Sequence, residues 1–305
     1  MSVIKHVTSK DSKTSKEDEV AFGFHTTASG DFAEHMTSLK TIFPRLSALQ
    51  IFASNPKSFS PSKWSNAKCT DIKDSSKKNK IRLFIHAPYI INPCVFNPDD
   101  LSTSERQVKL VLNLLEVGGC MNAEGVVIHV GKSLKLGEEE GLKRMKGFCQ
   151  YVLSKKPKTS CKLLIETCSG QGTEVAKDLK VFGKLINELV DEFGIDNIAA
   201  VIDTCHIFAA GYDLAKDPEK VFNTIEKTID WNNVDLIHLN DSSTPCGSRV
   251  DRHAAIGEGH IKIESLSMYV ELVTKCCPEI AWVFETPIGK DSDRMSEMAW
   301  FESLL

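Results

Sequence analysis

Six short apolar segments of this chain each end in a side chain that can bind a divalent metal ion. The segments occupy residues 82–86, 125–129, 161–166, 198–203, 234–238 and 280–285, and their last residues are His86, His129, Glu166, Asp203, His238 and Glu285. Continuous apolar runs of this length are typical of parallel strands that are buried on both faces. Buried imidazoles and carboxylates are costly unless they are paired or bound to metal. The pattern therefore predicts a parallel sheet with a metal site at one end of its strands.

Segments of helical character separate these apolar runs. They lie at 102–118, 138–153, 174–193, 218–229, 263–275 and 292–305. Two earlier apolar segments, at 21–27 and 46–52, supply the first two strands. Eight strands that alternate with helices predict a closed (β/α)8 TIM barrel, with the metal site at the C-terminal face of the strands. The polar segment 53–80 is expected to be a long connection that contributes to binding at that face.

One domain accounts for nearly all of the 305 residues, because a barrel of this kind needs about 250. Residues 1–20 are polar and lack periodicity, so we expect a disordered tail there and a single catalytic domain at 21–305. No apolar run reaches the roughly 18 residues of a membrane span, and the N-terminus lacks the apolar core of a secretory signal. With ten scattered cysteines read as reduced thiols, we expect a protein of the cytoplasm or nucleus that is neither secreted nor membrane-bound.

Two short motifs add three potential ligands to the six strand ends. His206 follows the strand-end residue Asp203 by three positions, in the turn after the strand, where both side chains can face one cavity. Asp251 and His253 are two positions apart and project to the same side of an extended segment. The nine residues together offer five imidazoles and four carboxylates without a thiolate. This mixture suits zinc or manganese in a catalytic role.

Nine ligands exceed the needs of one or two ions. If one carboxylate bridges two metals, each of three ions receives about three ligand bonds, which leaves positions for water and substrate. Four carboxylates offset only four of the six positive charges of three divalent ions. The surplus favours an anionic substrate, and phosphate is the natural one. The net charge of −4 for the whole chain argues against a broad basic surface for nucleic acid.

Longer motifs around these residues resemble the endonuclease IV family of apurinic/apyrimidinic (AP) endonucleases. The matching stretches are ETCSGQG at 166–172, DTCHIFAAGYD at 203–213, HLND at 238–241, GSRVDRH at 247–253, GEG at 257–259 and ETP at 285–287. The resemblance extends from about residue 21 to the C-terminus. It implies three zinc ions, with Mn²⁺ as an alternative at one position, and Glu166 as the catalytic residue that bridges two of them. The implied ligand sets are His86, His129 and Glu166 for the first ion, Glu166, Asp203, His238 and Glu285 for the second, and His206, Asp251 and His253 for the third.

The resemblance also implies a DNA repair enzyme that acts as a monomer. Such an enzyme hydrolyses the phosphodiester 5′ to an abasic site, giving a 3′-hydroxyl and a 5′-deoxyribose phosphate, and it removes blocking groups from 3′ ends. Its partner is double-stranded DNA with abasic sites or blocked 3′ ends. Members of the family flip the abasic nucleotide out and fill the gap with side chains. The matching positions are Lys57, Tyr89 and Ile90. In the family an Arg is more familiar at the position of Lys57, and a Leu at that of Ile90. His25 is expected only to line the cavity.

Two other functions fit parts of this pattern. A sugar isomerase or epimerase on the same barrel also gathers His, Asp and Glu at strand ends, but it holds one or two metals. It would leave His206, Asp251 and His253 without a role. A protein that binds damaged DNA without cutting it is expected to lack one of the nine ligands. Metal content and cleavage of a duplex with an abasic analogue distinguish these functions from a three-metal nuclease.

Overall fold

A computed structural model describes residues 20–28, 30–61, 64–286 and 291–305. In this part of the chain eight parallel strands close into a barrel, in which each strand pairs with its neighbour in the chain and β10 pairs with β1. The strands are β1 (Phe22–Thr26), β2 (Ala48–Ile51), β3 (Arg82–His86), β4 (Gly125–His129), β5 (Lys162–Glu166), β6 (Ile198–Asp203), β7 (Val234–His238) and β10 (Ala281–Phe284). The predicted TIM barrel is thereby confirmed.

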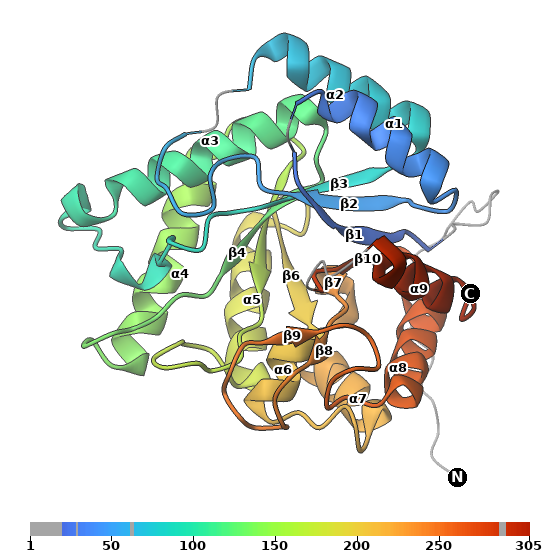
Figure 1. Cartoon of the computed structure of the whole chain (residues 1–305). Coiled ribbons are helices and arrows are strands. Elements are labelled where there is room, and N and C mark those ends of the chain that lie inside the picture. The colour runs from blue at the N-terminus through green and yellow to red at the C-terminus, as the bar shows by residue number, and fades with distance from the viewer. Residues whose placement is uncertain (1–19, 29, 62–63, 287–290) are drawn as a thin grey trace.

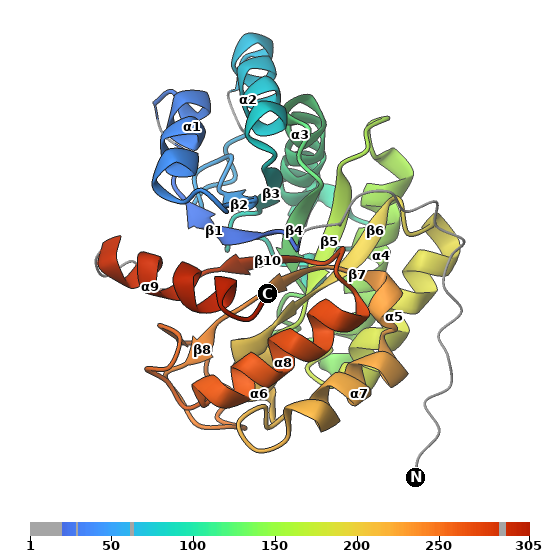
Figure 2. The same ribbon diagram turned by 90° about the vertical axis from the view of Figure 1, so that its right-hand side faces the viewer.

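Helices surround the barrel in Figures 1 and 2. They are α1 (Phe32–Ile42), α2 (Asn66–Asn79), α3 (Glu105–Met121), α4 (Glu138–Lys155), α5 (Leu179–Phe193), α7 (Pro218–Thr228), α8 (Ile263–Cys276) and α9 (Asp291–Glu302). Shorter elements occur in the connections: the helix α6 (Thr204–Ala210), the 3₁₀ turns η1 (Pro93–Val95), η2 (Leu101–Thr103) and η3 (Trp231–Asn233), and the strands β8 (Asp241–Ser242) and β9 (His253–Ala254). None of the described helices is both long enough and apolar enough to cross a membrane.

The barrel strands are buried on both faces, which explains why they are continuous apolar runs. In β4, Val127 belongs to the cluster that fills the barrel interior together with Phe84 and Leu164. The flanking residues Val126 and Ile128 belong to the larger cluster between the strands and the surrounding helices. Alternate residues therefore enter two different cores, and neither face of the strand meets water.

The expectation of a long connection at 53–80 is wrong over α2. Ser65 caps this helix by accepting a hydrogen bond from the backbone N–H of Lys68, and Lys80 ends it in a left-handed conformation at φ 54°. Its buried face includes Ser75 and Ser76, so the apolar periodicity that identifies a helix is weak. A second boundary also differs, because α5 begins at Leu179 rather than near residue 174.

The two short strands β8 and β9 form an antiparallel hairpin after β7. Asp241 anchors the loop that follows this hairpin. Its carboxylate accepts hydrogen bonds from the backbone N–H groups of Ser242, Gly257, Gly259 and Ile261 at 2.7–3.1 Å. Four donors on one buried carboxylate hold the hairpin in a defined position. Apart from Val20, the tail predicted at 1–20 lies outside the described residues, and the predicted domain at 21–305 stays a prediction.

Candidate metal centre

The structure brings the nine predicted ligands together where the barrel strands end. Their donor atoms form groups in which all atoms lie within 4.8 Å of one another. The groups are His86, His129 and Glu166, then Glu166, Asp203, His238 and Glu285, and finally His206, Asp251 and His253. Their role as ligands remains a prediction, but each group could hold one ion.

Glu166 at the end of β5 lies between the groups and is fully buried. Its Oε2 lies 3.4 Å from His86 Nε2 and 3.3 Å from His129 Nε2. Its Oε1 lies 3.0 Å from His238 Nδ1 and 3.3 Å from His206 Nδ1. Each carboxylate oxygen thus faces a different pair of imidazoles. The two oxygens could therefore contact two different ions.

Two imidazole nitrogens face each other in the first group. His129 Nε2 lies 3.3 Å from His86 Nε2. Two nitrogens bound to one zinc ion at about 2.0–2.1 Å in a tetrahedral site are separated by roughly the same distance. The facing nitrogens therefore fit a shared ion between them.

The residues of the second group contact one another, and the side-chain amide of Asn240 contacts two of them. His238 Nδ1 lies 3.2 Å from Glu285 Oε2 and 4.0 Å from Asp203 Oδ2. The Nδ2 of Asn240 donates to Asp203 Oδ2 at 2.7 Å, and its Oδ1 accepts from the backbone N–H of Glu285 at 2.9 Å. One buried side chain therefore contacts the predicted ligand at the end of β6 and the one that directly follows β10.

The third group combines α6 with the hairpin. The turn predicted after Asp203 is the first turn of α6, which Asp203 caps by accepting from His206 N at 2.8 Å. His206 Nε2 lies 3.2 Å from Asp251 Oδ2. His253, at the start of β9, directs its Nε2 toward Asp251 Oδ1 at 3.4 Å. Asp203, a predicted ligand of the second group, thus caps the helix that carries His206, a predicted ligand of the third group.

Backbone carbonyls define which ring nitrogen of three histidines remains available. His86 Nδ1 lies 2.7 Å from the carbonyl oxygen of the next residue, and His206 Nδ1 lies 2.8 Å from the carbonyl oxygen of Thr167. His253 Nδ1 lies 3.4 Å from the carbonyl oxygen of Glu285. A carbonyl only accepts, so Nδ1 carries a hydrogen, and Nε2 is the ring nitrogen whose lone pair a metal could take.

Burial and neighbouring charges shift the titration of these groups. Burial lowers the pKa of His129 to about 4, so its ring is neutral at pH 7. Burial also disfavours charge on His238, but the carboxylates of Glu285 and Glu166 raise its pKa to about 9. For Glu166, burial acts to raise the pKa, whereas the imidazoles of His129 and His238 hold it well below its ordinary range. An ion that binds here therefore meets an ionised carboxylate and displaces a proton from His238.

Comparisons with known proteins agree with this geometry. The family described as "Xylose isomerase-like TIM barrel" matches residues 46–271. A "Probable endonuclease 4" from Chloroflexus aurantiacus is 31% identical over 290 residues, which cover 93% of this chain and 98% of the relative. Another from Nitrosopumilus maritimus is 30% identical over 279 residues, which cover 89% and 95%. The chain belongs to the endonuclease IV family.

Solved structures lead to the same family. The crystal structure of endonuclease IV from Thermus thermophilus has a TM-score of 0.78 and 29% identity, and the match covers 93% of this chain and 99% of that chain. A D-tagatose 3-epimerase-like protein has a TM-score of 0.66 over 93% of this chain at 16% identity. An identity this low shows a shared barrel fold alone.

Seven of the nine predicted ligands line a cavity of about 470 Å³ in this endonuclease IV family member. His25, Phe52 and Tyr89 form part of its wall, so His25 lines the cavity as expected. Tyr89 is 63% exposed, and its ring centroid lies 5.2 Å from that of Phe52. The other two predicted DNA-contacting residues, Lys57 and Ile90, line a separate groove of about 760 Å³.

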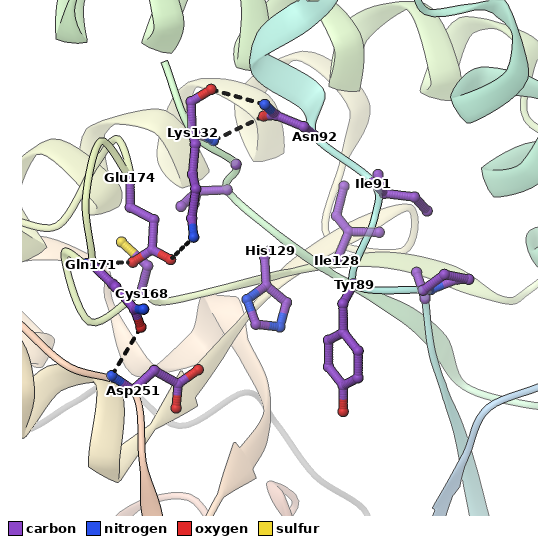
Figure 3. A pocket seen from close by; sticks show the side chains of 14 residues that line it. Tyr89, Ile91, Asn92, Ile128, His129, Lys132, Cys168, Gln171, Glu174 and Asp251 are labelled. Atoms are coloured by element: carbon purple, nitrogen blue, oxygen red, sulfur yellow. Dashed lines mark hydrogen bonds and ion pairs between the residues drawn. The ribbon is translucent and has the colours of Figure 1, made fainter. Parts of the chain in front are cut away.

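A smaller cavity of about 240 Å³, shown in Figure 3, adjoins the cavity of the candidate metal centre, because His129 and Asp251 line both. Figure 3 shows Lys132 extending toward Glu174, with its Nζ 3.8 Å from Glu174 Oε1. Gln171 accepts a hydrogen bond from the backbone N–H of Asp251 at 3.2 Å. The loop after β5 thus supports a predicted ligand of the third group.

Sequence reasoning did not identify Gln50, Asn240 or Cys205 as residues of this centre. Gln50 is a single polar residue in an apolar strand, and Asn240 was visible only as part of a longer motif. Cys205 lies with Asp203 and His253 in a further group of potential ligands. Burial raises the pKa of Cys205 to about 12, and its thiol donates to the carbonyl oxygen of Arg252 at 3.6 Å. A protonated thiol is a poor ligand, so this group competes weakly for metal.

Proposed function

We propose that this chain is an AP endonuclease of DNA repair that hydrolyses the phosphodiester 5′ to an abasic site. Its products would be a 3′-hydroxyl and a 5′-deoxyribose phosphate, and the same centre would remove blocking groups from 3′ ends. Membership of the endonuclease IV family supports a DNA-cleaving hydrolase. The observation that carries the finer proposal is the meeting of three ligand groups around Glu166.

Three divalent ions fit the residues present. Glu166 Oε2 and His253 Nε2 are buried and have no hydrogen-bond partner in the described part of the chain. Such atoms are costly unless something binds them. Imidazoles and carboxylates favour zinc, with Mn²⁺ as an alternative at one position. The proposed sets are His86, His129 and Glu166, then Glu166, Asp203, His238 and Glu285, and finally His206, Asp251 and His253.

The side chains of this chain prepare the site for a phosphodiester. Bound ions supply Lewis acidity and positive charge for in-line displacement at phosphate. Glu166, the proposed catalytic residue, is ionised at neutral pH and belongs to two of the ligand groups. Arg252 lines the same cavity and adds a positive charge for the substrate, while Phe52 and Tyr89 place two aromatic rings in its wall.

The rim of the cavity suits a distorted duplex. Tyr89 is exposed at this rim, where an aromatic ring can enter the space left by a flipped nucleotide. Lys57 and Ile90 line the neighbouring groove together with Arg106 and Lys109, and no carboxylate lines it in the described part of the chain. Cations beside apolar side chains can contact phosphates and bases of one DNA strand. We therefore assign gap filling to Tyr89, Ile90 and Lys57, and the ammonium group of Lys57 can also contact the DNA backbone.

A duplex with one tetrahydrofuran abasic analogue tests the proposal. Zinc-loaded protein is expected to nick the strand directly 5′ to the analogue and to leave an undamaged duplex intact. Absence of that nick would overturn the proposal. Elemental analysis is expected to find about three zinc ions per chain. One or two ions together with sugar isomerase activity would favour the isomerase alternative instead. The monomeric state and the intracellular location stay predictions.

A further inference from the structure

Gln50 on β2 contacts two members of the four-ligand group without being a predicted ligand itself. Its side chain is fully buried. Its Nε2 lies 2.5 Å from Glu285 Oε1 and 3.1 Å from His25 Nδ1. Its Oε1 lies 2.9 Å from His238 Nε2. Both ends of one amide therefore touch the metal centre.

The chemistry of the neighbours determines which way the amide points. An ionised Glu285 carboxylate only accepts, so the Gln50 atom that faces it must be the NH₂ group. The second hydrogen of that group can be accepted by the Nδ1 of His25. The carbonyl oxygen of Gln50 must then face His238, and it accepts a hydrogen from His238 Nε2. Reversal of the amide would put two oxygens in contact at Glu285.

This orientation has a direct consequence for His238. Its Nε2 carries a hydrogen, so Nδ1 is the ring nitrogen that remains for an ion. Nδ1 lies 3.0 Å from Glu166 Oε1 and 3.2 Å from Glu285 Oε2, where the other donors of the group converge. The hydrogen on Nε2 is present in both the neutral ring with free Nδ1 and the imidazolium. Gln50 can therefore hold the ring both before and after an ion binds.

We propose that Gln50 is a positioning residue that holds His238 with Nδ1 toward the second ion and fixes Glu285 beside it. The inference rests on the proposed metal function of these groups. Partners of this kind, which hydrogen-bond to metal ligands, typically change metal affinity by about 10–100-fold when removed. Gln50 contacts two of the four ligands in this group, so its loss is expected to weaken one ion selectively.

Metal binding by Gln50→Leu is the first test. Leucine has a similar size but makes none of the three contacts, so zinc affinity at one of three sites is expected to fall about 10–100-fold. The control is Gln107→Leu, since Gln107 is also buried and accepts from the backbone N–H of Asn92 outside the four-ligand group. Both variants are titrated with zinc against a chromophoric chelator. Wild-type affinity in Gln50→Leu, or an equal loss in the control, would overturn the proposal.

Histidine ring NMR of the zinc-loaded protein supplies a readout that a merely structural role would not move. In the ¹⁵N-labelled wild type, His238 is expected to carry a hydrogen on Nε2 that exchanges slowly with solvent. Gln50→Leu should lose the protection of this hydrogen, whereas the control Gln107→Leu should retain the signal. A hydrogen on Nδ1 in the wild type would contradict the inference. Neither measurement uses DNA, so failure to cleave an abasic duplex is seen separately, and a wild type that binds no zinc would overturn both proposals.

Discussion

Single side chains in this centre serve more than one neighbour. Asp203 caps α6 through the backbone N–H of His206, accepts from Asn240, and faces His238 across the second group. Glu166 divides its two oxygens between two pairs of imidazoles. A substitution at such a residue removes several contacts at once, so its effects should exceed those of any one lost hydrogen bond.

Glu166→Ala is expected to remove cleavage and leave duplex binding in place. The substitution removes the proposed bridge between two ions, and metal stabilisation of a phosphoryl transition state is worth several kcal/mol, so the rate should fall at least about 100-fold. Cleavage of the abasic duplex and its binding in a gel-shift assay are measured in parallel. Glu188→Ala on the outer surface of α5 serves as the control. Equal losses of binding and cleavage would count against the bridging role.

Zinc should stabilise the protein more strongly as the pH rises. The pKa of His238 is raised from 6.5 to about 9, because the carboxylates of Glu285 and Glu166 outweigh the effect of burial. In the metal-free protein the raised pKa of His238 adds to the free energy of unfolding. This contribution is complete below pH 6.5 and is lost as the pH rises through about 9. Zinc displaces the same proton, so its effect on Tm is expected to grow between about pH 6.5 and 9. A zinc-induced shift that is constant or shrinks over this range would contradict the assignment.

At the scale of elements, the hairpin of β8 and β9 and the loop between its strands supply two of the three residues of the third ligand group, Asp251 and His253. Its position depends on the loop that returns from β9 to Asp241. Gly259 lies against the carboxylate of Asp241 and the carbonyl oxygen of Ser242, and a Cβ at this position would clash with both. The loop therefore needs a glycine there for close backbone approach rather than for a left-handed turn.

Gly259→Ala is expected to destabilise the protein by about 1–3 kcal/mol, because a backbone oxygen cannot move aside easily. Zinc content should fall at the same time, since the displaced loop carries the hairpin with His253. Gly147→Ala on α4 is the matched control: its new Cβ would meet only Phe96 at 3.5 Å, an ordinary contact. An alanine in a helix is favoured over glycine by up to about 1 kcal/mol, so this control should be at least as stable as the wild type. Equal free energies of unfolding for the two variants, measured in urea, would show that position 259 does not require a glycine.

At the scale of the whole molecule, the net charge of −4 hides a local arrangement of cations. Lys57 comes from the connection after β2, whereas Arg106 and Lys109 come from α3, and all three line one groove. Lys109 also pairs with Glu105 at 2.6 Å, so its charge is partly offset. Only folding brings these cations into one groove with Ile90, next to Tyr89 in the wall of the ligand cavity.

Arg106→Ala is expected to weaken binding of damaged and undamaged duplexes alike. A phosphate contact carries no sequence or lesion information, so KM should rise while kcat stays near that of the wild type. The slope of log affinity against log salt should decrease by about one. Lys184→Ala on α5, outside this groove, provides the control and should keep the slope. Loss of discrimination between damaged and undamaged DNA would instead indicate a role in lesion recognition.

The sequence by itself determined the barrel and the nine side chains where its strands end, because both can be recognised from short stretches of neighbouring residues. Apolar runs that end in His86, Glu166 or Asp203 are visible without any tertiary information. The tertiary structure alone decided how those side chains are held. Gln50 meets His238 and Glu285 across 188 and 235 residues of chain, and no local pattern predicts which buried amide will face which ligand. The helix α2 was missed for a related reason, since its buried serines become a packing face only against α1 and α3.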